Sequence, residues 1–387
     1  MTPGRLYLDY NATSPLSPLV RQWLMGGDFI FANPASQHSD GKQARRSINQ
    51  ARKFILDFFH LKENDYNLFF HSGATEGLNT IVNHFHLWAM NEKRPLILAY
   101  ARGDHPAVVE ACQSVTSAIQ VELKRNAHGD YLNGENFQLL KELKEKNPAA
   151  IILYNHLWLH NEIGVVSALK ELSIFKSIPD LYLNVDAVQT VGKFHQYRDL
   201  SSMVDFYTYS AHKFGALKGI GFSFVKSTHK LSPLIIGGGQ QSKARSGTEN
   251  AMGVHSIKLA LEDMATKDLA SLEAFKNKLS DQMREWLKGK GALVGDRALQ
   301  TSLNTIYFYL NNLSSDIALA MFDMSGLEIS AGSACSSGAA KDSEILLSLG
   351  LEKVAKNGLR LSLGPDLSLI DEIEVLSRLE DLLKRIP

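Results

Sequence analysis

Lys213 follows the strand-like run DFYTYS (205–210) almost directly, within the sequence SAHKFG. Serine and histidine side chains beside it could hold an anion such as a phosphate, so its amine is well placed to form an imine with a bound aldehyde. The ordinary fate of a lysine is to be solvated at the surface, and Lys218 is expected to be of that kind. These residues alone leave both interpretations of Lys213 open.

Asp186 ends another apolar run, LYLNVD (181–186). A buried carboxylate needs a partner, and a protonated pyridine nitrogen would suit it, although Asp186 could instead cap the next segment. Gln189 could hydrogen-bond a substituent of the same ring. His105 and Asn161 also follow apolar runs. His105 could lie against a ring and carry protons near pH 7, but a lone histidine is more often a structural hydrogen-bonding residue, and Asn161 is a similar case.

The segment SGATE (72–76) joins an apolar run to a helical pattern. Glycine lets the backbone approach an anion, and the first N–H groups of the helix supply donors, so the segment could hold a phosphate. The alternative is a helix cap in which the side chain of Thr75 or Ser72 binds these N–H groups. From this segment alone the cap is the favoured interpretation.

Cys335 lies among small residues, in AGSACSSG (331–338), which favours an exposed, mobile loop. Cys112, within VVEACQSV, has the apolar neighbours of a packing residue. Nearby cations, with His105 and Arg360 as candidates, should help to ionise the Cys335 thiol, whose ordinary pKa is about 8.5. Arg360 lies in a predicted strand and could bind a substrate carboxylate through its planar fork, with an exposed ion pair as the alternative.

No metal site is expected. The chain has 2 cysteines, far apart, and no cysteine–histidine cluster with zinc spacing. His156 and His160 are four residues apart but lie in an apparent strand, which argues against a metal-binding pair. Without a disulfide framework, a signal peptide or an apolar run long enough to span a bilayer, we expect a soluble protein of the cytoplasm.

Composition excludes an overall electrostatic attraction to nucleic acid or to anionic lipid. The 387 residues contain 41 Lys and Arg and 41 Asp and Glu, so the formal net charge is zero. The hydrophobic content of 44% is ordinary for a globular protein, and a chain of this length can bury a large core.

Short apolar runs alternate with helical patterns from about residue 66 to residue 226, which predicts a mostly parallel α/β sheet covered on both faces. A polar, glycine-rich stretch (233–253) is expected to be a loop. A second α/β unit follows the helical pattern that starts near residue 256. We therefore predict a large domain of residues 14–255 and a small domain formed by residues 1–13 and 256–387.

Ten stretches of the chain, in order, resemble the cysteine desulfurases, which have the class-V aminotransferase fold. They are YLDYNATSP (7–15), NPASQHSDGKQAR (33–45), SGATEG (72–77), DHPAVVEAC (104–112), NEIGVV (161–166), VDAVQTVGK (185–193), SAHKFGALKGIG (210–221), GGGQQSKARSGTEN (237–250), GSACSSG (332–338) and LRLSLG (359–364). The resemblance implies a fold-type I enzyme that uses pyridoxal 5'-phosphate and converts L-cysteine to L-alanine.

The resemblance also implies a role for each matching residue. Lys213 would hold the cofactor as a Schiff base and move the Cα proton of the substrate, and Cys335 would accept sulfur as a persulfide. Asp186 would pair with the pyridine nitrogen, Gln189 with the ring oxygen, and His105 would stack on the ring. The phosphate would be held by Ala74, Thr75, Ser210 and His212. Asn161, beside the cofactor, and Arg360 would orient the substrate.

Partners follow from the same resemblance. Thr248 would reach the cofactor phosphate of the other subunit, which implies a homodimer with shared active sites. Sulfur would pass to an acceptor protein for iron–sulfur cluster assembly or tRNA thiolation, without direct binding of nucleic acid or membrane. A selenocysteine lyase, a cysteine sulfinate desulfinase and a non-catalytic scaffold are the alternatives. The chain departs from the family at Asp104, at His160, at Ala216-Leu217, and at residues 339–342.

Overall fold

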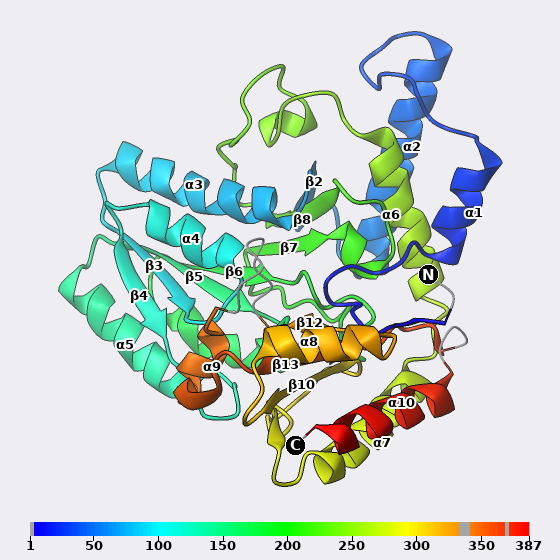
Figure 1. The fold of residues 1–387 in the computed structure, drawn as a ribbon. Helices are drawn as coiled ribbons and strands as arrows, with labels where there is room; N and C mark the ends of the chain where they lie inside the picture. Colours follow the sequence, from blue (N-terminus) through cyan, green and yellow to red (C-terminus); the bar gives the residue numbers. More distant parts are fainter. Residues whose placement is uncertain (1–3, 333–340, 368–370, 387) are drawn as a thin grey trace.

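A seven-stranded sheet forms the larger part of the molecule (Figure 1). The computed structural model describes residues 4–332, 341–367 and 371–386. The strands lie in the order β2 (Tyr66–His71), β8 (Gly221–Lys226), β7 (Phe206–Ser210), β6 (Leu181–Asp186), β5 (Ile151–Leu157), β3 (Leu96–Ala101) and β4 (Ile119–Leu123). Strand β8 runs antiparallel to both of its neighbours, β2 and β7, and the other pairings are parallel, so the predicted mostly parallel sheet is confirmed.

Helices cover both faces of this sheet, because the inner strands are buried at every position. On one face, α3 (Ala74–Glu92) and α4 (Pro106–Ser114) share a core with alternate strand residues such as Leu98 and Leu153. On the other face, the residues between these, such as Ile97 and Ile152, share a core with α2 (Ser39–Phe58), α5 (Asn133–Lys146) and α6 (Ala251–Met264). Alternation of the side chains along each strand therefore assigns its residues to two layers.

A four-stranded antiparallel sheet forms the C-terminal part, in the order β12 (Ser330–Ala331), β13 (Gly358–Ser362), β10 (Thr305–Leu310) and β9 (Gly291–Val294). The helices α7 (Leu269–Trp286), α8 (Ser315–Met324) and α10 (Glu372–Arg385) pack on it. Their buried residues recur at helical spacing, as Leu272, Phe275, Leu279 and Met283 do in α7.

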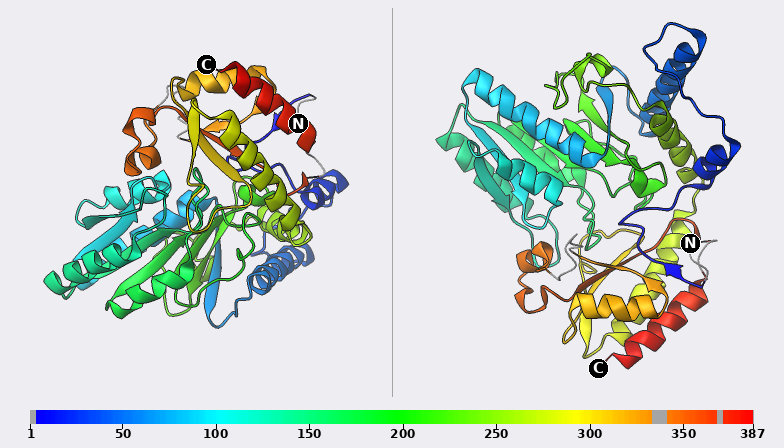
Figure 2. Two further views of the ribbon diagram at one scale, coloured as in Figure 1. Left: turned by 90° about the horizontal axis from the view of Figure 1, so that it is seen from below. Right: turned by 45° about the horizontal axis from the view of Figure 1, so that its top comes forward.

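The N-terminal segment lies against this C-terminal sheet (Figure 2). Strand β1 (Leu6–Tyr7) pairs in parallel with β11 (Leu327–Glu328), and Asp9 forms a bridge to Ser362 at the end of β13. Helix α6 runs without a break from Ala251 to Met264 and so crosses the predicted domain boundary near residue 255. The position of that boundary stays a prediction.

The remaining elements are short or lie outside the sheets. They are α1 (Pro18–Gly26), α9 (Glu344–Ser348) and the 3₁₀ turns η1 (Leu169–Ser177), η2 (Ala211–Phe214), η3 (Gln241–Lys243) and η4 (Glu352–Val354). Between β5 and β6 the connection is therefore a 3₁₀ segment and not a regular α-helix. Among the described residues, no helix is long and apolar enough to cross a membrane.

Candidate active site

Lys213 lies in η2, directly after β7, and its side chain points to the N-terminal segment. Its Nζ donates to the backbone oxygens of Asn11 and Ala12, each at 2.8 Å. Burial lowers the pKa of Lys213 to about 8, and the charge of Arg360 acts in the same direction, while Asp9 and Asp186 oppose it. Lys213 is therefore not an ordinary surface lysine.

Lys218 is exposed, as expected of a solvated lysine. This contrast removes the alternative that Lys213 shares that fate. The difference follows from position: Lys213 is in the turn that ends β7, whereas Lys218 precedes the glycine-containing entry to β8.

Asp186 ends β6, beside β7, and only 5% of it is exposed. Its Oδ1 accepts a hydrogen bond from the backbone N–H of Val188 at 3.0 Å, so the local capping interpretation accounts for one oxygen. Asp186 takes part in none of the ion pairs among the described residues, and burial raises its pKa to about 7. A cation placed against it would therefore be held strongly.

Gln189 lies one turn after Asp186, and its Nε2 donates to the same Asn11 oxygen that Lys213 binds, at 3.0 Å. Its Oε1 accepts a hydrogen bond from Lys193 Nζ. The backbone oxygen of Asn11 thus joins Lys213 and Gln189 in one site. Neither Asn11 nor Lys193 was predicted as a site residue, although both lie in stretches that resemble the cysteine desulfurases.

His105 precedes α4 and caps it, because its Nδ1 accepts from the backbone N–H of Ala107 at 3.1 Å. The neutral ring therefore carries its proton on Nε2. Burial, together with the charge of Lys213, lowers the pKa of His105 to about 4. A neutral ring at pH 7 would not supply the cation expected beside Cys335, but Cys335 lies outside the described residues, so that expectation stays a prediction.

Arg360, in β13, is buried beside the N-terminal segment. Its Nη2 donates to Asp9 Oδ1 at 2.9 Å and its Nη1 donates to the backbone oxygen of Asn161 at 3.1 Å. The Arg360 Nε and the Asn161 Oδ1 atoms are buried, and neither has a hydrogen-bond partner. The alternative of an exposed ion pair is excluded, and the two unpartnered atoms point to a polar ligand.

The first turn of α3 is not capped by a side chain. Gly73 is the N-cap residue, and neither Ser72 nor Thr75 binds the free N–H groups, so the favoured capping interpretation is wrong. Instead, the carboxylate of Glu76 accepts from the backbone N–H of Ser72 at 2.8 Å and pairs with Arg245 at 3.0 Å. The N–H groups of Ala74 and Thr75 are left for an anion.

Ser210 and His212 flank this region from the end of β7. Ser210 is the last residue of the strand and is buried, and His212 Nδ1 lies 3.1 Å from Thr13 Oγ1. Burial lowers the pKa of His212 to about 4, and the charges of Lys213 and Lys218 act in the same direction. Its ring is therefore neutral at pH 7 and can donate a single hydrogen bond to an anion.

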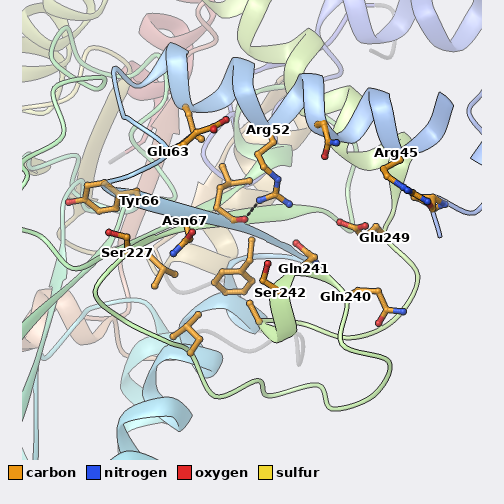
Figure 3. A pocket seen from close by; sticks show the side chains of 18 of the residues that line it. Arg45, Arg52, Glu63, Tyr66, Asn67, Ser227, Gln240, Gln241, Ser242 and Glu249 are labelled. Atoms are coloured by element: carbon orange, nitrogen blue, oxygen red, sulfur yellow. Dashed lines mark hydrogen bonds between the residues drawn. The ribbon is translucent and has the colours of Figure 1, made fainter. Parts of the chain in front are cut away.

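Thr248 lies elsewhere, in the wall of a separate cleft of about 980 Å³. Helix α2, strand β2 and the loop 240–249 enclose this cleft, and Arg45, Arg52 and Glu249 line it (Figure 3). Arg52 donates to the backbone oxygen of Leu68 and lies over the ring of Phe70. Thr248 is therefore not brought together with Lys213 in this chain.

Cys335 lies outside the described residues, as do residues 339 and 340 among the departures from the family pattern. Cys112 is buried, and burial raises the pKa of its thiol to about 12, so it is the packing residue that was expected. His156 is in β5 and His160 follows it. The described part of the chain contains no cluster of three or more side chains that could hold a metal ion.

Residues 6–375 match the family model described as Aminotransferase class-V. A cysteine desulfurase IscS of Dictyoglomus turgidum is 31% identical over 98% of this chain and 94% of its own length. The chain belongs to the cysteine desulfurases of this family. IscS of Clostridium botulinum is 29% identical over 98% of this chain and 95% of its own length. A solved NifS-like protein, 23% identical, has the same fold, with a TM-score of 0.84 over 98% of both chains.

The two departures from the desulfurase pattern near the site are held by buried contacts. Asp104 pairs with Arg125 at 2.6 Å, where both side chains are almost fully buried, and it also accepts from the hydroxyl of Tyr131. His160 Nε2 lies 3.0 Å from the backbone oxygen of Gly103 and its Nδ1 accepts from the backbone N–H of Glu162. Both residues therefore fix the turns that carry His105 and Asn161.

Proposed function

We propose that this protein uses pyridoxal phosphate to convert L-cysteine to L-alanine and transfers the sulfur to Cys335. One observation carries the proposal: a half-buried Lys213 and a buried Asp186 lie at the ends of adjacent strands. Among the described residues, the Lys213 amine is bound only by backbone oxygens, and the Asp186 carboxylate takes part in no ion pair. Membership of the cysteine desulfurases supports the choice of substrate.

The residues present fit pyridoxal phosphate. Asp186 would hold the protonated pyridine nitrogen, because its buried carboxylate lacks a cation, and the uncapped first turn of α3 would hold the phosphate with Ser210 and His212. Gln189 would donate to the ring oxygen, His105 would lie on the ring, and Lys213 would bind the aldehyde carbon. When bound, the cofactor supplies an electron sink that acidifies the Cα–H of an amino acid and weakens its bond from Cβ to sulfur.

An amino-acid substrate would meet Arg360 and Asn161. The guanidinium can bind a carboxylate, and the unpartnered Arg360 Nε and Asn161 Oδ1 supply a donor and an acceptor. Lys213 would then remove the Cα proton through Nζ. Its lowered pKa, about 8, gives a usable fraction of free amine near neutral pH.

The sulfur transfer balances without an added oxidant. The bond between Cβ and sulfur in L-cysteine breaks with its electron pair remaining on carbon, and Cβ takes up a proton to give L-alanine. A new sulfur–sulfur bond forms to Cys335, and the thiol proton is transferred, which leaves a persulfide on the protein. A reductant or an acceptor protein then removes the outer sulfur.

We further propose a cytoplasmic homodimer in which Thr248 serves the cofactor of the other subunit. The position of Thr248 in the separate cleft, away from Lys213 of its own chain, supports this arrangement. The acceptor would be a protein of iron–sulfur cluster assembly or of tRNA thiolation.

Release of sulfide and alanine from L-cysteine, with a reductant present, tests the function. We expect equal amounts of both from the wild type and neither from Cys335→Ala, while the absorption band of the bound cofactor is unchanged. Cys112→Ala, which removes a buried thiol next to Asn155, is the matched control and should keep its turnover.

Full turnover of L-cysteine by Cys335→Ala would contradict the role of Cys335. Selenocysteine and cysteine sulfinate, assayed with the same variants, test the alternatives, because they depend less on the thiol. Absence of the cofactor band in the wild type would overturn the assignment.

A further inference from the structure

Lys193 is a buried lysine beside the half-buried Lys213, and the mechanism above does not use it. Only 5% of Lys193 is exposed, and it takes part in none of the ion pairs among the described residues. Burying an amine without a carboxylate partner costs folding free energy unless hydrogen bonds compensate for the lost water. Among the described residues, the single acceptor of its Nζ is Gln189 Oε1.

The contacts of Gln189 fix which way its amide faces. Lys193 Nζ donates to Oε1, which places this end of the amide toward Lys193. The backbone oxygen of Asn11 can only accept, so Nε2 must face Asn11. Because Lys213 Nζ binds that same Asn11 oxygen, the NH₂ group of Gln189 is directed to the place where Lys213 reacts.

We propose that Lys193 is a positioning residue, which holds the Gln189 side chain with its NH₂ group turned toward the site. This inference rests on the proposed function, since it is the ring oxygen of the cofactor that Gln189 would meet. Without Lys193, Gln189 Oε1 would be left buried and unsatisfied, and the amide would lose one of the two contacts that orient it.

Burial and two neighbouring positive charges disfavour the charged form of Lys193 in the protein without cofactor. Burial, together with the charges of Lys213 and Arg360, lowers the pKa of Lys193 well below its usual range, and Asp9 alone opposes them. Asp186 also raises the pKa of Lys213, and the charge of Lys213 in turn lowers the pKa of His105 and of His212. A neutral amine still donates to Gln189, so the positioning role needs no charge on Lys193.

Lys193→Met tests the proposal, with Lys276→Met as the matched control. Lys276, in α7, is also buried, with 8% exposed, and its Nζ donates to Thr301 Oγ1 at 3.2 Å, away from Gln189. Binding of pyridoxal phosphate, and of pyridoxal without its phosphate, is measured by absorbance titration of the protein freed of cofactor. The pH midpoint of the absorption band of the bound cofactor is measured as well.

We expect Lys193→Met to weaken both ligands by the same factor, about tenfold, because the loss concerns the ring oxygen and not the phosphate. The pH midpoint should move with it, whereas Lys276→Met should leave both unchanged. In the background of Gln189→Leu, the substitution of Lys193 should add little, because Lys193 acts through Gln189.

Unchanged binding and an unchanged pH midpoint in Lys193→Met would overturn the proposal, and so would a full additional loss in the Gln189→Leu background. If both lysine variants lost the same thermal stability and the absorption band of the bound cofactor did not change, Lys193 would have a structural role only. That result would also overturn the proposal. A wild type that binds neither ligand would instead overturn the proposed function.

Discussion

Asp9 Oδ1 lies 2.9 Å from Arg360 Nη2, so the chain's own carboxylate holds the guanidinium that we expect to meet the substrate. Asp9 Oδ2 is held in turn by the hydroxyl of Ser330 at 2.6 Å. The contact uses one end of the guanidinium and leaves Nε without a partner. Asp9 thus orients the Arg360 guanidinium and leaves its Nε available to a ligand.

Asp9→Ala should raise the KM for L-cysteine about tenfold and change kcat less, because Arg360 loses the buried acceptor that orients it. The initial rate of alanine release over a range of L-cysteine concentrations measures both constants. Asp323→Ala is the matched control, since that exposed carboxylate pairs with Arg5 at the surface. An unchanged KM in Asp9→Ala would mean that Asn161 and β13 alone orient Arg360.

The rate at which pyridoxal phosphate attaches to the protein should rise with pH through about 8, the pKa to which Lys213 is lowered, and then level off. An ordinary lysine, with a pKa of about 10.4, would still be gaining rate at pH 10. Because Asp9 raises the pKa of Lys213, Asp9→Asn should move the midpoint to lower pH. The time course of the absorption change after mixing measures this rate, and a midpoint near 10 would contradict the prediction.

Asp186→Asn should stabilise the protein without cofactor at pH 8, on the order of 2–4 kcal/mol. Burial raises the pKa of Asp186 to about 7, so its folded form favours the proton, and stability is lost as pH rises from about 4 to 7. The gain in the variant should therefore vanish near pH 4. Urea unfolding at both pH values measures it, and cofactor binding should be lost in the same variant.

Asp205→Asn is the matched control for that experiment. Asp205 is buried too, but hydrogen bonds and charges from His229 and Lys176 lower its pKa. Its substitution should therefore destabilise the protein at pH 8. If both substitutions changed the free energy of unfolding at pH 8 in the same direction, burial alone, and not the lack of a cation, would account for the effect of Asp186 on stability.

Arg125→Met should destabilise the protein by about 3–5 kcal/mol, because it leaves the Asp104 carboxylate buried without its partner. The double variant with Asp104→Asn should lose less than the sum of the two single losses. Urea unfolding provides the free energies. Asp57→Ala, which breaks the exposed pair with Lys53, should change stability by less than about 1 kcal/mol, and additive losses at Asp104 and Arg125 would contradict the coupling.

The sequence predicted the strands well because they are nearly continuous apolar runs, and the ends of β6 and β7 placed Asp186 and Lys213 correctly. The prediction failed where the role of a residue depends on which groups lie opposite it in the folded chain. The first turn of α3 has the residue types of a capped helix, yet no side chain caps it. Likewise, no local pattern shows that desolvation and the charge of Lys213 lower the pKa of the His105 ring.

The residues that were missed come from the beginning of the chain or from behind the site. Asn11 acts through its backbone oxygen, which any residue type would offer, so its identity gives no signal. Asp9 and Lys193 could have been found by their places in LDYNATSP and in VDAVQTVGK. Their partners, Arg360 and Gln189, are identified only once the chain is folded.

The pairing of the N-terminal segment with β11 and β13 makes the site depend on residues that are 351 positions apart in the sequence. Asn11 is held by Ser362, whose hydroxyl accepts from the Asn11 N–H at 2.9 Å, and Asp9 bridges to the same residue. Asn11 therefore offers a fixed acceptor to Lys213 and Gln189 only once β13 has been made and has packed against it. Capture of the cofactor in its final form must therefore follow the synthesis of β13.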